Sequence, residues 1–142
     1  MINSFKRGAA AYADVAVETG VASADPHQLI VLLYDGALSA IARAIQAIGA
    51  GQIALKGESI SKAIQIVEEG LKASLDESVG GELALQLGSL YEYMARQLLF
   101  ASVRNDVAAL KEVARLLEDL KGAWESIGTQ TRPAAVTGRI AA

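Results

Sequence analysis

The most regular feature of the chain is a series of apolar residues at helical spacing that begins shortly after residue 25. Asp25 can cap a helix, Pro26 suits the first helical position, and Gln28 can complete a capping box. The apolar positions that follow are separated by steps of three and four, as on one face of a helix: Ile30, Tyr34, Ala37, Ile41, Ala44 and Ile48. We therefore predict a first helix that starts at Pro26 and ends at Gly49 and Gly51.

Three further segments show the same period, and each is bounded by glycine or polar residues. A second helix is predicted over about 55–75, a third over about 82–103, and a fourth after the break at 104–106. Their core-facing positions are Ile60, Ile64, Val67, Leu71 and Leu75, then Leu83, Leu87, Leu90, Met94, Leu98 and Ala101, then Leu110, Val113, Leu117, Leu120, Trp124 and Ile127. Because short loops join the four helices, we predict an all-α, antiparallel, up-down four-helix bundle over residues 25–127.

The two ends of the chain lack this pattern. Residues 1–24 mix small residues with a few large apolar ones, which predicts an N-terminal arm that forms either a short cap helix or an extended segment. Residues 128–142 contain Gly128, Pro133 and Gly138 without an apolar period, and a disordered tail is predicted there.

Composition limits the classes of protein that fit this bundle. The 142 residues suit one domain, 52% of them are hydrophobic, and the net charge is −3, so the chain is neither intrinsically disordered nor basic enough to favour nucleic acid. The densest apolar run, 29–34, is too short to cross a membrane, and acidic residues interrupt the apolar stretch near the N-terminus that would suit a signal peptide. We expect a cytoplasmic protein without membrane insertion.

Residue types that support catalysis are scarce. The chain has no cysteine and one histidine, His27, which excludes thiol catalysis, cysteine zinc sites and di-metal sites built on Glu-x-x-His pairs. Glycine fingerprints for phosphate binding and the spacing of a calcium loop are also absent. We expect no enzyme activity, no metal and no cofactor, and we interpret His27 as a surface residue at a helix start. A phosphotransfer bundle that uses His27 is kept as an alternative function.

The predicted helices carry more apolar residues than a plain bundle needs. The first and third helices have second apolar stripes beside their core faces, which include Leu33, Leu85, Tyr91 and Leu99. A helix that is apolar on most sides is either central in its fold or covered by another chain, and a four-helix bundle has no central helix. The extra stripes indicate a groove for partner helices or, as an alternative, the contact of a homodimer.

Four glycines fall inside the predicted helices, where each costs about 1 kcal/mol relative to alanine. They are Gly36, Gly70, Gly88 and Gly122. We expect a close backbone approach at these positions, either between helices of the bundle or against a bound peptide.

An ordered set of short motifs resembles one known family. In chain order the matching residues are Ala10-Ala11-Tyr12, Asp25-Pro26-His27-Gln28-Leu29-Ile30, Leu33-Tyr34-Asp35-Gly36, Lys62-Ala63 with Ile66, Ser74-Leu75-Asp76, Gly80-Gly81-Glu82-Leu83, Leu90-Tyr91-Glu92-Tyr93-Met94, Arg104-Asn105-Asp106 and Trp124. Each motif alone is short, but the set runs in order from about residue 8 to 127 and resembles the flagellar secretion chaperones of the FliS family.

The resemblance implies a cytosolic type III export chaperone. Such a protein binds the disordered C-terminal region of flagellin, prevents premature polymerisation and keeps flagellin competent for the flagellar export apparatus. The resemblance also implies that the N-terminal arm folds over part of the binding surface. The apolar stripes and the resemblance together indicate these candidate residues for the flagellin groove and its N-terminal cap: Tyr12, Leu33, Tyr34, Leu71, Leu85, Tyr91, Met94 and Leu99.

Overall fold

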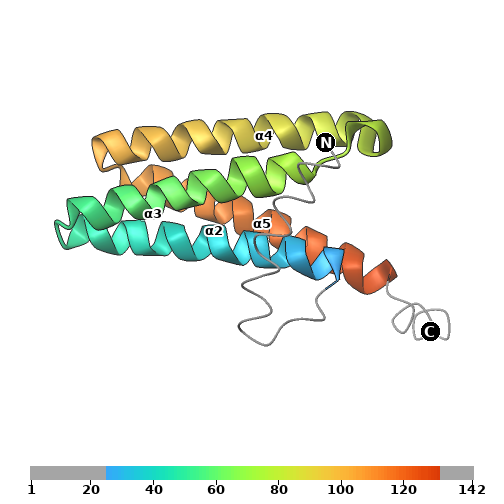
Figure 1. The fold of residues 1–142 in the computed structure, drawn as a ribbon, viewed down its shortest axis with the longest axis horizontal. Coiled ribbons are helices and arrows are strands. Elements are labelled where there is room, and N and C mark those ends of the chain that lie inside the picture. The colour runs from blue at the N-terminus through green and yellow to red at the C-terminus, as the bar shows by residue number, and fades with distance from the viewer. Residues whose placement is uncertain (1–24, 132–142) are drawn as a thin grey trace.

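The computed structural model describes residues 25–131, which form a bundle of helices (Figure 1). Its elements are α2 (Pro26–Gly49), α3 (Ile53–Gln65), the π-helix η1 (Ile66–Leu71), the 3-10 turn η2 (Lys72–Ser74), α4 (Glu77–Arg104) and α5 (Val107–Thr131). Because α3, η1 and η2 follow one another without a break, four rods run up and down beside one another. The predicted four-helix bundle is confirmed, whereas the predicted arm, 1–24, and the last part of the predicted tail, 132–142, lie outside the described residues.

The boundaries of α2 follow from the local sequence. The Asp25 carboxylate accepts a hydrogen bond from the backbone N–H of Gln28 (2.8 Å), and Gln28 Oε1 accepts one from the backbone N–H of Asp25 (3.3 Å), which completes a capping box. Pro26 occupies the first helical position. At the other end, Gly51 has a φ of 69° and turns the chain toward α3. Both predicted boundaries of the first helix are confirmed.

The second rod is less regular than its apolar period predicts. The sequence predicts one α-helix over 55–75, whereas the structure has α-helical, π-helical and 3-10 geometry in succession. Gly70 in the π-helix is buried against α2, where an added Cβ would lie 3.0 Å from a methyl carbon of Leu33, so the close approach predicted there is confirmed. A close approach within the bundle is absent at Gly88, where the nearest atom would be 3.7 Å away, and at Gly122, where nothing lies within 4 Å. For these two glycines the alternative, an approach by a bound peptide, stays a prediction.

The last two helices are longer than predicted. α4 begins at Glu77, but Gly81 interrupts it with φ 57° and ψ −132°, a conformation that glycine adopts readily and other residues do not. Regular helix therefore resumes at Glu82, where the sequence places the helix start. α5 continues through Gly128 to its end, so the first residues of the predicted disordered tail are helical instead. Gly128 is buried against His27, and this tertiary contact holds the end of α5 in place.

Apolar side chains from all four rods fill the interior. The largest fully buried ones are Leu33, Ile41, Ile60, Ile66, Leu71, Met94, Leu98, Leu110, Leu117, Val67 and Val113. Among the described helices, α2 is long and apolar enough by length and composition to cross a membrane, with a mean hydropathy of 1.4 in its most apolar window. Burial accounts for part of this apolarity, because α2 packs against both α3 and α5 and supplies much of the core.

Two buried tyrosines connect α2 with α4, which are not adjacent helices in the bundle. The hydroxyl oxygens of Tyr34 and Tyr91 are 2.7 Å apart, and the two residues are 4% and 2% exposed. One hydroxyl donates and the other accepts, so both have a partner inside the core. Burial raises the pKa of both hydroxyls above the usual value of 10.0.

The first turn of α2 is joined to the last turns of α5 by His27 and Trp124. Their rings are stacked, with centroids 4.8 Å apart and planes 8° from parallel. Trp124 Nε1 donates to the His27 carbonyl oxygen (3.0 Å), and His27 Nε2 donates to the Trp124 carbonyl oxygen (2.7 Å). The interpretation of His27 as a plain surface residue is wrong, because packing against a helix far away in the sequence covers part of it.

Two alanine substitutions in α5 should have opposite effects on stability. A Cβ at Gly122 meets nothing within 4 Å, so Gly122→Ala should raise the free energy of unfolding by about 0.5 to 1 kcal/mol. A Cβ at Gly128 would overlap the His27 imidazole, so Gly128→Ala should lower that free energy by about 1 to 3 kcal/mol. Urea unfolding followed by circular dichroism measures both. Equal effects of the two substitutions would show that α5 does not press against His27.

The tyrosine pair should make the fold sensitive to alkali. Since the folded-state pKa values are raised, the stabilisation is complete below the unfolded pKa of 10.0 and is lost as the pH rises through the folded pKa. Between about pH 8 and 11.5, the free energy of unfolding should fall more steeply for the wild type than for Tyr34→Phe/Tyr91→Phe. At pH 7, Tyr91→Phe alone should cost about 1 to 2 kcal/mol, because the Tyr34 hydroxyl loses its partner. Urea titrations at each pH measure these values, and identical pH slopes would contradict the assignment.

Candidate binding pocket

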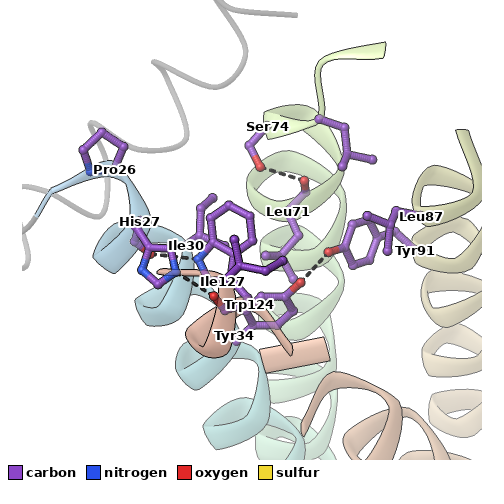
Figure 2. Close-up of a pocket in the computed structure, with 11 residues that line it drawn as sticks. Pro26, His27, Ile30, Tyr34, Leu71, Ser74, Leu87, Tyr91, Trp124 and Ile127 are labelled. Atoms are coloured by element: carbon purple, nitrogen blue, oxygen red, sulfur yellow. Dashed lines mark hydrogen bonds between the residues drawn. The ribbon is translucent and has the colours of Figure 1, made fainter. Parts of the chain in front are cut away.

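An apolar pocket lies at the end of the bundle where α2 begins and α5 ends (Figure 2). Its volume is about 380 Å³, and its walls are formed by Pro26, His27, Ile30, Tyr34, Leu71, Ser74, Leu75, Leu87, Tyr91, Trp124 and Ile127. In Figure 2 the two tyrosine hydroxyls point toward each other from α2 and α4, and Trp124 and Ile127 approach from α5. All four rods contribute to the wall, so the pocket depends on the tertiary packing of the whole bundle.

Most polar groups on the pocket wall already have partners within the protein. The tyrosine hydroxyls bond each other, and Ser74 Oγ donates to the carbonyl oxygen of Leu71 (2.8 Å). His27 Nε2 bonds Trp124, while His27 Nδ1 is buried without a hydrogen-bond partner among the described residues. The wall therefore offers a ligand apolar contact area rather than hydrogen bonds.

The described residues do not assemble a catalytic or metal site. In the range 25–131, no group of three or more His, Cys, Asp or Glu residues is placed to hold a metal ion. His27 has one ring nitrogen in a hydrogen bond and the other buried, so neither is available to accept a phosphoryl group. The geometry argues against the phosphotransfer alternative.

Large apolar side chains are exposed on the first half of α4, which also supplies Leu87 to the pocket. Val79, Leu83 and Leu85 are 83%, 64% and 55% exposed, and Ile127 on the pocket wall is 50% exposed. Apolar area that is exposed next to an apolar pocket is typical of a protein interaction site. The pocket and this part of α4 together form the candidate site.

The structure separates the buried members of the predicted groove into two groups. Tyr34, Leu71 and Tyr91 are buried and also line the pocket. Leu33 and Met94 are buried in the core away from the pocket wall, although they were expected in the groove. Leu33 faces inward because it fills the space beside Gly70. This member of the second apolar stripe of α2 therefore packs within the bundle and is not free to contact a partner.

The remaining predicted groove residues are on the surface or outside the described range. Leu85 and Leu99 are 55% and 59% exposed on α4, but they are about 21 Å apart along the helix axis. Leu85 belongs to the pocket half of the bundle, and Leu99 lies near the opposite end of α4. Tyr12 lies outside the described residues.

Sequence reasoning missed most of the pocket wall. Helical periodicity assigns no role to Ser74 or to the contact between the His27 and Trp124 rings. It assigns the other apolar wall residues to core faces, namely Ile30, Leu75, Leu87, Trp124 and Ile127. Periodicity shows which side of a helix is apolar but not whether neighbouring helices meet closely enough to fill the space between them. The available signal was the convergence of four apolar stripes at one end of the bundle.

Comparison with known proteins identifies the family. A family model described as "Flagellar protein FliS" matches residues 8–131. The chain is 52% identical over 120 residues to the flagellar secretion chaperone FliS of Salmonella typhimurium, a match that covers 84% of this chain and 89% of that protein. It is 46% identical to the FliS of Escherichia coli, with 84% and 88% covered, and 45% identical to the FliSB of Pseudomonas aeruginosa, with 82% and 91% covered. The chain therefore belongs to the FliS family of flagellar secretion chaperones.

Proposed function

We propose that this chain binds flagellin through the apolar pocket and the exposed side chains of α4, and that it holds flagellin ready for export. The observation that carries the proposal is an apolar pocket of about 380 Å³ beside exposed Val79, Leu83 and Leu85. Membership of the flagellar secretion chaperones supports the same function. Binding of a client requires no catalytic group, in agreement with the sequence-based expectation of a protein that is not an enzyme.

The proposed client segment is the C-terminal region of flagellin, which is disordered before it binds. Because the pocket wall offers few free hydrogen-bonding groups, an entering segment must satisfy its own backbone groups, and a helix does so. Each large aliphatic side chain that becomes fully buried contributes about 1.5 to 3 kcal/mol. Several such side chains are needed, since part of the gross energy is used to order the segment.

From the pocket, the client extends along the outer face of α4 past Leu85 toward Leu99. Covering the segment in this way keeps it from contacting other flagellin molecules, which prevents premature polymerisation. The complex forms in the cytoplasm and delivers flagellin to the flagellar export apparatus. The homodimeric alternative stays a prediction; it would use the same exposed apolar side chains and would therefore compete with the client.

The N-terminal arm is the proposed cap of this pocket in the free protein. The support is positional, because Pro26 at the start of α2 lies on the pocket wall and the arm joins the chain directly before it. A cap that places Tyr12 on the apolar surface would limit self-association. It would also lower the apparent affinity for flagellin in proportion to the capped fraction.

Leu85→Glu should weaken the complex with the C-terminal segment of flagellin about ten- to a hundredfold, because a carboxylate would be buried at the interface. Leu99→Glu should also weaken this complex. Both residues are more than half exposed in the free protein, so its stability should change by less than about 0.5 kcal/mol. The matched control is Ala42→Glu, an exposed position on α2, which makes no contact with α4. Calorimetric titration measures the affinities, and unchanged binding by Leu85→Glu would refute the proposed site.

Deletion of residues 1–17 should uncover the pocket. We expect the truncated protein to bind more of an environment-sensitive dye, to keep its helical circular dichroism signal, and to bind flagellin as tightly as the full chain or more tightly. A Tyr12→Ser variant of the full chain should show a smaller change in the same direction. Unfolding of the truncated protein would instead show that the arm is part of the core and would contradict the cap.

A further inference from the structure

Charge is distributed unevenly along the bundle. When each of the four rods in the described range is divided at its middle, the half that contains the pocket holds eight carboxylate residues, Asp25 and Asp76 beside the rods included, and two lysines. The other half holds seven basic residues and six carboxylate residues, the loop residue Asp106 included. The pocket half lies at the right of Figure 1, where α2 begins and α5 ends. The net charge of −3 for the whole chain hides this contrast.

Both lysines of the pocket half are already paired. Lys72 Nζ lies 2.9 Å from Oε2 of Glu92, a residue just beyond the middle of α4, and Lys121 Nζ lies 2.6 Å from Asp35 Oδ1. Three carboxylates of the pocket half, Asp25, Asp76 and Glu82, form no salt bridge with a described residue. They therefore keep a negative potential at the pocket end that no described basic side chain cancels.

These three carboxylates belong to the segments that build the pocket. Asp25 directly precedes the wall residue Pro26, and Asp76 directly follows the wall residue Leu75. Glu82 begins the regular part of α4, about one and a half turns before the wall residue Leu87 and about two and a half turns before Tyr91. Asp25 and Asp76 accept hydrogen bonds from backbone N–H groups at helix starts. The hydrogen bond from the Ser78 hydroxyl lowers the pKa of Asp76, which favours its charged form.

We propose that the pocket selects a client segment whose apolar face is flanked by lysine or arginine, with the carboxylates at Asp25, Asp76 and Glu82 as the selecting groups. The inference rests on the proposed function, since it describes the chemistry of the client at the same pocket. The apolar wall supplies contact area but few hydrogen bonds, so discrimination between apolar helices falls to the charges around it. In the opposite half, basic and carboxylate residues nearly balance and offer the same flanks no net attraction, so the contrast directs the cationic part of the client to the pocket end.

A pair of synthetic helical peptides tests the selection directly. Both carry the same leucine stripe, and they differ only in flanking lysines or flanking glutamates. Trp124 is the single tryptophan of the chain and lies on the pocket wall, so its fluorescence reports binding. In about 20 mM salt the lysine peptide should bind at least about tenfold more tightly than the glutamate peptide, and in about 500 mM salt the difference should shrink to about twofold. Equal affinities in low salt would overturn the proposal.

A set of neutralised variants assigns the effect to the pocket end. Asp25→Asn/Asp76→Asn/Glu82→Gln removes three charges and keeps both helix caps, since asparagine caps as well as aspartate. The matched control, Glu58→Gln/Asp106→Asn/Glu118→Gln, removes three charges from the other half. The first variant should bind the lysine peptide about three- to tenfold more weakly in low salt, and the control should bind like the wild type. Equal weakening in both would mean that net charge alone matters, and it would overturn the proposal.

Two further outcomes distinguish failure of the charge selection from failure of the proposed flagellin binding. If the pocket-end variant binds the lysine peptide more tightly, the carboxylates hold the basic residues of the chain's own ends, such as Lys6 and Arg7 or Arg132 and Arg139, and the proposal is wrong. If the lysine peptide binds as expected but the C-terminal segment of flagellin does not bind in the same buffer, the proposed function fails and the charge selection stands. Urea unfolding of both variants confirms that they remain folded.

Discussion

The contact between the first turn of α2 and the last turns of α5 sets the geometry of the pocket end. His27 and Trp124 are far apart in sequence, yet their rings stack and each residue donates one hydrogen bond to the other's carbonyl oxygen. Two bonds and a stacked pair fix both the distance and the rotation of the two helices. Gly128 permits this approach, because a side chain there would occupy the place of the imidazole. The positions of Ile30, Tyr34 and Ile127 on the pocket wall follow from this junction.

A second constraint keeps the pocket apolar. The two hydroxyls that could make it polar, those of Tyr34 and Tyr91, are directed at each other across the bundle. Each hydroxyl satisfies the other's hydrogen-bonding capacity, so the two rings present apolar faces to the pocket while they connect two rods that are not adjacent in the bundle. The helix that carries Leu71 changes to π geometry beside this pair, at the point where Gly70 meets Leu33.

Function follows from what the bundle leaves unfilled. A four-helix bundle buries one apolar face of each helix, but here exposed apolar residues continue along α4 beyond the pocket. The stability of the fold depends on the buried face, whereas a client would use the exposed one. Substitutions on the two faces should therefore separate folding from binding. The carboxylates at the pocket end add a long-range field to a surface whose short-range contacts are largely non-directional, which gives an apolar site a means of choosing among helices.

The sequence by itself determined the helices and their order. The capping box at Asp25, the apolar period and the glycine breaks are local, so the start of α2 and the all-α bundle could be predicted from the chain alone. The FliS motifs likewise indicated the family. Tertiary structure decided which apolar residues became core, pocket or surface: Leu33 and Met94 are in the core, Tyr34 and Tyr91 on the pocket wall, and Leu85 and Leu99 on the surface. Periodicity could not separate them, because it describes one helix at a time, whereas burial depends on how closely the neighbouring helices approach. The contact between His27 and Trp124, the helical end of α5 and the clustering of charge at one end of the bundle also arise only when segments distant in sequence are packed side by side.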